Sequence, residues 1–283
     1  MFFYFKVFVG LPNTITILCT HSYHLMLRAS NTKNRGSGDS SKRIGKLLDR
    51  MIASDVKPTS LTFKLILERW SGPTNNVNLR SDPIEMMDRV LEAEKVLERM
   101  EQMYKSGQIN DSPTTKLFNI VLSCWCSSNT QSKGLRARKL LESMNQLYNA
   151  GNPYTKPDFH SYSLVINSCL GQLNTLSVAE KRNSFNAVIK TFQEMTVSDK
   201  AQPHSITYRN VLKACKLLLP GDAEQQHHTN AVFQHCCRVG VVDDIVLDGF
   251  RFAAEPKLFK EVTGSDVCRE IPARWRKNVG VNN

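Results

Sequence analysis

The sequence predicts an all-α fold in which pairs of helices stack side by side into a solenoid. Two observations lead to this prediction. Four segments of the 283-residue chain align without gaps on an aromatic residue that lies five positions after a proline. Each of these segments is followed by another with the apolar spacing of a second helix. Because a single helix pair cannot bury its apolar face alone, such pairs are expected to stack on their neighbours.

Residues 1–43 differ from the rest of the chain and are expected to be a targeting or disordered segment. The first 20 residues are apolar but include Lys6 and Pro12, whereas a membrane span needs ~20 clean apolar residues. Residues 21–43 are basic and rich in Ser and Asn, as organellar transit segments are. We therefore expect no stable membrane insertion and an organellar location, in a mitochondrion or a plastid. A non-native start of the chain is the alternative.

The first helix of each pair is predicted over residues 57–70, 112–125, 156–169 and 202–215. In all four the aromatic opens an apolar stripe at i, i+3, i+4 and i+7, which is one face of an α-helix. The stripes are Phe63/Ile66/Leu67/Trp70, Phe118/Val121/Leu122/Trp125, Tyr162/Val165/Ile166/Cys169 and Tyr208/Val211/Leu212/Cys215. Pro58, Pro113, Pro157 and Pro203 are expected to open these helices, because proline's missing N–H costs nothing in a first turn and the polar residues that follow can cap. We expect the stripes to be buried.

The second helices are predicted from a small or apolar residue, an apolar residue four positions on, and a methionine or cysteine three positions later. They read AEKVLERM, ARKLLESM, VIKTFQEM and TNAVFQHC, at 93–100, 137–144, 188–195 and 229–236. A further copy, IGKLLDRM at 44–51, precedes the first proline. The repeats are therefore predicted over residues 44–240, beginning half-way through a pair.

Residues 241–283 are expected to form a C-terminal cap and tail. Terminal repeats need a polar cap. The run from Pro272 to Lys277 places Trp275 among three cations, and we expect it to fold back on the last repeat. Contact with a nucleic-acid phosphate is the alternative for this run.

Charge and cysteine content narrow the class of protein. The net charge is +11, but the excess lies mainly at the ends: residues 57–255 carry 23 Lys and Arg against 20 Asp and Glu. The eight cysteines are too sparse for a disulfide scaffold and are expected to be buried free thiols. Cys124-Trp-Cys126 and Cys236-Cys237 lack zinc spacing, and no phosphate loop or nucleophile motif occurs. We therefore expect no enzyme, no metal site and no cofactor.

One repeat resembles a known family closely. Residues 157–169 read Pro-Asp-x-x-Ser-Tyr-x-x-x-Ile-Asn-x-Cys, and the helix after them ends in Phe-x-x-Met. This pattern resembles the pentatricopeptide repeat, and the resemblance extends over about residues 44–240. The related tetratricopeptide repeat places its proline at the end of the second helix and lacks the Tyr-x-x-x-Ile motif.

The resemblance implies an α-solenoid of the tetratricopeptide and pentatricopeptide kind, a superhelix whose first helices line the concave face and bind single-stranded RNA. It also implies a role in processing, stability or translation of an organellar transcript, together with other proteins of an RNA-processing complex. A protein-binding scaffold that uses the same groove is the alternative function.

The resemblance further implies which residues face the bases. These are the residue after the aromatic and the residue after the proline that closes the same repeat. Carried over by motif, they are Lys64 with Thr114, Asn119 with Asp158, and Ser163 with His204, and Arg209 opens the fourth repeat. The Asn119/Asp158 combination is one that the family associates with uracil. The alternative is that Asp158 caps a helix and Asn119 is solvated.

Charge placement supports the same face. The first helices carry Lys64, Arg69, Lys116, Arg209, Lys213 and Lys216 against Glu68 alone, whereas the second helices are nearly balanced. A phosphate backbone needs such a positive face. We predict that Lys64, Lys116, Arg209 and Lys213 contribute to RNA binding together.

Overall fold

The computed structural model describes residues 19–32, 38–71, 83–131, 133–171, 173–265 and 272–279. Within these ranges the chain forms thirteen α-helices and two short 3-10 helices, and no strand. The predicted all-α class is therefore confirmed.

The helices fall into two alternating sets. The first helices are α1 (Thr20–Thr32), α3 (Ser60–Ser71), α5 (Thr115–Ser127), α7 (Phe159–Cys169), α9 (Ser205–Leu218) and α11 (Asp244–Ala253). The second helices are α2 (Gly38–Ala53), α4 (Pro83–Lys105), α6 (Lys133–Asn149), α8 (Val178–Thr196) and α10 (Ala223–Val239). The short helices α12 (Pro256–Thr263) and α13 (Ala273–Arg276) follow, and the 3-10 turns are η1 (Pro153–Thr155) and η2 (Leu173–Thr175).

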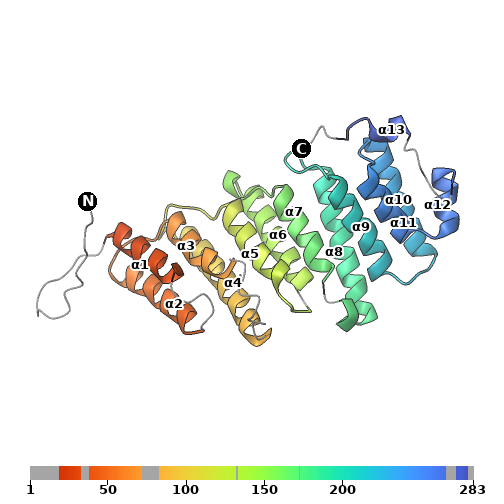
Figure 1. The fold of residues 1–283 in the computed structure, drawn as a ribbon. Coiled ribbons are helices and arrows are strands. Elements are labelled where there is room, and N and C mark those ends of the chain that lie inside the picture. The colour runs from red at the N-terminus through yellow and green to blue at the C-terminus, as the bar shows by residue number, and fades with distance from the viewer. Residues whose placement is uncertain are drawn as a thin grey trace, which may run out of the picture.

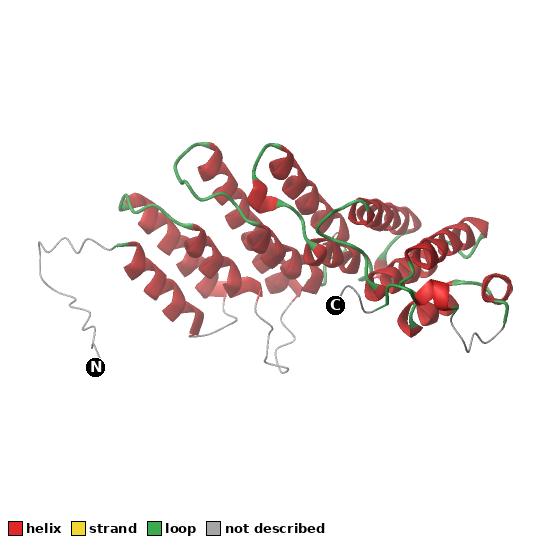
Figure 2. Ribbon diagram, turned by 90° about the horizontal axis from the view of Figure 1, so that it is seen from above, coloured by secondary structure: helices red, strands yellow, loops and turns green. Residues whose placement is uncertain are grey.

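Neighbours in sequence are neighbours in space. Each first helix packs against the helix that follows it in the chain, and the first helices also contact one another in order from α1 to α11. The molecule is elongated, with α1 and α2 at one end and α12 near the other (Figure 1). Seen from above, the helices form a continuous row (Figure 2). The fold is therefore helical and repeat-like along its length.

The predicted apolar stripes form the core. Every stripe residue whose side chain is described is at most 5% exposed, and the side chain of Trp70 lies outside that set. The buried residues form two clusters, one on each side of α7. Tyr162 and Val165 belong to the N-terminal cluster and Ile166 and Cys169 to the C-terminal one, so α7 joins the two halves.

The cysteines are part of this core. All seven that the structure describes are free, and five of them are buried: Cys124, Cys169, Cys215, Cys236 and Cys237. The expectation of buried thiols is confirmed for these five, but it is wrong for Cys19, which is exposed, and for Cys126, which is half-buried. Cys268 lies outside the described residues. Burial raises the pKa of the Cys124, Cys169 and Cys215 thiols to about 12. They are therefore protonated, and hence unreactive, near neutral pH.

The helix starts differ in detail from the prediction. Each of the four prolines lies two residues before its helix begins, so proline precedes the helix instead of occupying its first turn. The residue between proline and helix is the N-cap in α5, α7 and α9. Of these three, only Asp158 caps with its side chain; Thr114 and His204 make no side-chain cap bond.

Helix α1 completes the first pair, which was expected to lack a first helix. It lies within residues 1–43 and packs against both α2 and α3. Tyr23 and Leu27 are buried, and the Tyr23 hydroxyl donates to the carbonyl of Arg50 at 3.3 Å. Tyr23, Met26 and Leu27 have the aromatic, i+3, i+4 spacing of the other first helices, but no proline precedes them. Residues 1–18 of the expected targeting segment lie outside the described residues.

The C-terminal segment packs on the last helix pair. Trp275 of α13 is 9% exposed and meets the ring of Phe233 of α10 edge-on, with centroids 5.6 Å apart. The backbone amide of Val242 donates to the backbone carbonyl of Trp275 at 2.8 Å. The backbone amide of Asn278 donates to the backbone carbonyl of Gly240, also at 2.8 Å. Helix α11 continues the row of first helices beyond α9.

Candidate functional site

At two junctions between successive first helices, the residue directly after one aromatic is hydrogen-bonded to the residue directly before the next. His24, directly after Tyr23 on α1, has Nε2 2.8 Å from the hydroxyl of Thr62 on α3. Asn119, directly after Phe118 on α5, accepts a 2.7 Å hydrogen bond at Oδ1 from the hydroxyl of Ser161 on α7. Thr62 and Ser161 each lie one residue before the aromatic of their helix. The two links are therefore equivalent, and they use the position predicted to face a base.

The predicted pair Asn119 and Asp158 is brought together by the fold. Asn119 Nδ2 donates to Asp158 Oδ1 at 3.1 Å. The same carboxylate oxygen accepts from the Ser161 amide at 2.9 Å and completes a capping box at the start of α7. The alternative interpretation of Asp158 as a helix cap is therefore confirmed. Asn119 is half-buried and hydrogen-bonded on both amide atoms, so the solvated form expected with that alternative is wrong.

Replacing Asn119 by Ala should destabilise the protein in the absence of any ligand. The variant loses two hydrogen bonds between α5 and α7, one of them to a carboxylate, whereas the hydrogen bonds between Ser161 and Asp158 remain. We expect the free energy of unfolding to fall by about 1–3 kcal/mol, measured by urea denaturation. Asn149→Ala, at the exposed end of α6, is the matched control and should stay within about 0.5 kcal/mol of the parent. An unchanged denaturation midpoint for Asn119→Ala would show that the link contributes nothing.

The junction between α7 and α9 is not closed by such a link. The equivalent residues are Ser163, after Tyr162, and Thr207, before Tyr208. Both hydroxyl oxygens are buried, and neither has a hydrogen-bond partner. Because serine is shorter than asparagine or histidine, its hydroxyl does not bridge the space that those side chains span at the other junctions.

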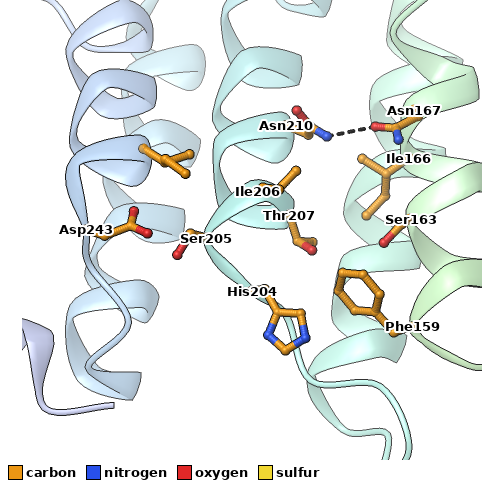
Figure 3. Close-up of a pocket in the computed structure, with 11 residues that line it drawn as sticks. Phe159, Ser163, Ile166, Asn167, His204, Ser205, Ile206, Thr207, Asn210 and Asp243 are labelled. Atoms are coloured by element: carbon orange, nitrogen blue, oxygen red, sulfur yellow. Dashed lines mark hydrogen bonds between the residues drawn. The ribbon is translucent and has the colours of Figure 1, made fainter. Parts of the chain in front are cut away.

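A pocket of about 380 Å³ lies at this junction, and we call it the α7–α9 pocket. It is lined by Phe159, Ser163, Ile166 and Asn167 of α7, His204 to Thr207 and Asn210 at α9, and Asp243 and Ile245 at the start of α11. Figure 3 shows Ser163 and Thr207 between α7 and α9, with the Phe159 and His204 rings towards one end and the Asn167–Asn210 hydrogen bond towards the other. The ring centroids lie 4.5 Å apart, and Asn210 Nδ2 donates to Asn167 Oδ1 at 2.7 Å. The fold therefore brings the predicted pair Ser163 and His204 into one pocket.

A second pocket lies next to the first, between α9 and α11. This α9–α11 pocket has a volume of about 410 Å³ and is lined by Arg209, Asn210, Lys213, Asp248, Gly249 and Phe252. Asn210 lines both pockets, so the two are adjacent on α9. The predicted residues Arg209 and Lys213 thus lie together, one helical turn apart.

The remaining predicted residues lie outside both pockets. Lys64 on α3 is exposed and forms an ion pair with Glu68 at 3.5 Å. Thr114 is the N-cap residue of α5, and Lys116 is exposed in its first turn. Lys64 and Thr114 therefore line neither the α7–α9 pocket nor the α9–α11 pocket.

The cations of α5 and α9 form no ion pairs within the described residues, whereas many cations of the second helices do. On the second helices many cations form ion pairs, among them Lys95, Arg99, Arg136, Arg138, Arg182 and Lys190. Among the described residues, Lys116, Arg209, Lys213 and Lys216 form none, and all four are exposed. The positive charge of α5 and α9 is therefore available to a ligand, as is that of Lys46, Lys139 and Arg238 on second helices.

Helix α9, which contributes to both pockets, is held by a buried aromatic anchor. The hydroxyl of Tyr208 lies 2.9 Å from Nδ1 of His235 on α10, and Phe192 of α8 meets the Tyr208 ring edge-on at 5.4 Å. Burial raises the pKa of Tyr208 and lowers the pKa of His235, so both are neutral at neutral pH.

Several pocket residues were missed from the sequence. Thr207, Asn167 and Asn210 lie on predicted helices at positions to which no role was given. Ile245 and Phe252 lie on α11, which was assigned to the cap. A signal for α11 exists: Leu247 lies four residues after the N-cap Asp243, the spacing of Tyr162 after Asp158. This helix was not predicted because Leu247 stands where the other first helices have an aromatic residue.

The described part of the chain contains no helix both long and apolar enough to cross a bilayer. It also contains no group of three His, Cys, Asp or Glu side chains arranged to hold a metal ion. No family model matches the chain, and no curated protein matches it.

Proposed function

We propose that the chain binds single-stranded RNA along its first helices, as a solenoid of helix pairs of the pentatricopeptide type. The α7–α9 pocket takes an unpaired base, and the cations of α5 and α9 lie along the phosphate backbone. An organellar location and a role in processing, stability or translation of a transcript there are part of the proposal. The basic, Ser- and Asn-rich composition of residues 21–43 is typical of a transit segment, although Thr20–Thr32 form helix α1 of the fold.

The observation that carries the proposal is the pair of buried hydroxyls, Ser163 and Thr207, that line an open pocket without a partner. Leaving a buried hydroxyl unsatisfied costs about 1–3 kcal/mol. Both oxygens are covered in the free protein, so a ligand entering the pocket has to displace the side chains over them and supply the missing hydrogen bonds. The edges of splayed bases carry such donors and acceptors, whereas the deep major groove of an RNA duplex hides them from side chains. A pocket between helices therefore favours single strands.

One observation favours the alternative, a protein-binding scaffold. Ile206, Ile245 and Phe252 are 53%, 39% and 51% exposed. The two isoleucines line the α7–α9 pocket, and Phe252 lines the α9–α11 pocket. An apolar helix of a partner could cover these side chains. Such binding would depend weakly on salt, whereas RNA binding would weaken steeply as salt rises.

A fluorescence-anisotropy titration separates the two functions. The full chain, which keeps α1 packed on α3, is titrated into single-stranded and duplex RNA pools at two salt concentrations. Preference for single strands that weakens with salt supports the proposal. Equal, weak binding to both pools contradicts RNA binding as the function and favours the protein-binding scaffold.

Replacing Thr207 by Val, with Ser163→Ala as a second variant, should weaken RNA binding without weakening the fold. Valine keeps the shape of threonine but removes the unpartnered hydroxyl, so we expect the free energy of unfolding to stay equal or rise by up to about 1 kcal/mol. The RNA dissociation constant should rise about 10-fold, the equivalent of one hydrogen bond of roughly 1.4 kcal/mol. Denaturation and anisotropy are measured on the same samples. A loss of stability in both variants would show that the two hydroxyls are satisfied within the protein and do not await a ligand.

A further inference from the structure

The α9–α11 pocket joins the candidate site to a helix that the sequence assigned to the cap. It borders the α7–α9 pocket at Asn210, so a strand whose base occupies the first pocket passes next to the second. A role of the second pocket in binding the same ligand rests on the proposed function.

The charges of this pocket favour a phosphate. Arg209 and Lys213 lie on one face of α9 at i and i+4, both exposed, and neither forms a hydrogen bond or ion pair within the described residues. The one acid of the lining, Asp248, forms an ion pair with Arg251 at 3.5 Å. The pocket therefore holds two cations against a partly neutralised carboxylate.

Close packing of α9 on α11 positions the arginine. A Cβ atom added to Gly249 would lie 3.1 Å from both Cα and Cγ of Arg209, so the stem of Arg209 rests on the bare backbone of α11. A larger residue at position 249 would push the two helices apart. Glycine here brings a cation of α9 into the same small space as the side chain of Phe252.

Phe252 is the aromatic residue of this lining, and its ring is half exposed. It is 51% exposed, whereas Phe250 on the same helix and Phe233 on α10 are fully buried. Single exposed apolar residues are common on protein surfaces. This one differs because it forms the wall of a pocket beside two unpaired cations. Base–aromatic stacking stabilises single-strand complexes and is tolerant of sequence, since every base has a π-face.

We infer that the α9–α11 pocket binds the nucleotide next to the one in the α7–α9 pocket, with its base stacked on Phe252 and its phosphate between Arg209 and Lys213. Helix α11 is thus part of the RNA-binding surface. This second subsite adds affinity without reading the base, because its contacts are a π-face and cations.

The test compares Phe252→Leu with Phe252→Trp in the full chain, using a fluorescein-labelled random-sequence single-stranded RNA as the probe. Leucine keeps apolar area but has no π-face, and we expect its dissociation constant to rise about 10-fold. Tryptophan should bind as tightly as the parent or more tightly, and unlabelled RNA should quench the introduced indole. The slope of affinity against salt should be the same in all three proteins, because no charge changes. Circular dichroism checks that both variants are folded.

The outcomes separate this inference from the proposed function. If Phe252→Leu binds like the parent and the introduced tryptophan is not quenched, while Thr207→Val still weakens binding, the second subsite is overturned and the proposed function stands. If the parent does not bind the RNA probe at all, both are overturned. Loss of binding in both the leucine and the tryptophan variants would also overturn stacking, since it would show a requirement for the shape of phenylalanine.

Discussion

Replacing Lys116, Arg209 and Lys213 together by glutamine should abolish most of the electrostatic part of RNA binding. All three are exposed on first helices and lack ion-pair partners in the described residues, so each is available to a phosphate. For single strands, log Kobs falls with log[salt] with a slope of about −0.7 per phosphate contact. Three lost contacts should therefore reduce the slope by about 2 and weaken binding about 100-fold at 0.1 M salt. The measurement is anisotropy titration at several salt concentrations.

The control is a variant with the same change in net charge on the second helices. Lys46 on α2, Lys139 on α6 and Arg238 on α10 are also exposed and have no ion-pair partner in the described chain. Replacing these three by glutamine should leave the salt slope within about one contact of the parent. An equal loss of affinity in both variants would mean that RNA responds to net charge alone. No loss in either would remove the first helices as the binding face.

Lys64 should contribute less than the other cations to this effect. In the sequence, Lys64 belongs with Lys116, Arg209 and Lys213, because all four lie on the predicted first helices. The structure pairs Lys64 with Glu68 at 3.5 Å. Both side chains are more than 40% exposed, so the pair is weak, but it still offsets the charge that a phosphate would meet.

Local patterns were enough to predict the core. The i, i+3, i+4, i+7 stripes follow from helix geometry alone, and their side chains are buried as expected. The same patterns failed where one element of the template was missing. Helix α1 lacks the preceding proline, and α11 has Leu247 in place of the aromatic, yet both pack in the row because their remaining apolar residues are enough to bury one face.

The site could not be predicted to the same extent, because it depends on distances between helices. Asn119 and Ser163 hold equivalent places in sequence, and the family resemblance gives both the same role. In the fold, Asn119 reaches Ser161 and Asp158, and its junction is closed. Ser163 makes no such link, and a pocket remains. Whether a side chain links two helices or leaves a pocket depends on its length relative to the distance between the helices. The sequence alone does not give that distance.

The helix spacing behind the site is set in part by a buried arginine, and its loss should have the largest effect on stability. Arg138 on α6 is 6% exposed. Its guanidinium binds both carboxylate oxygens of Glu194 on α8, with Nη1 to Oε2 at 2.8 Å, and also donates to the hydroxyl of Thr191 at 3.1 Å. These contacts join the second helices on either side of α7. Helix α7 packs against both α6 and α8, so the spacing of these two helices fixes its position. Helix α7 in turn lines the α7–α9 pocket.

Replacing Arg138 by Met should therefore lower the free energy of unfolding by about 3 kcal/mol, measured by urea denaturation. A loss of about 3 kcal/mol is the lower end of the range for breaking a buried ion pair. The lower end applies because the side chain of Glu194 is 29% exposed, so water can partly solvate the carboxylate left behind. Adding Glu194→Leu should recover most of the loss, since two apolar side chains of similar volume replace a pair without leaving an unpaired charge. If the single variant is as stable as the parent, the ion pair does not hold α6 to α8. If the double variant is as unstable as the single one, the contribution of Arg138 lies in its packing and not in its charge.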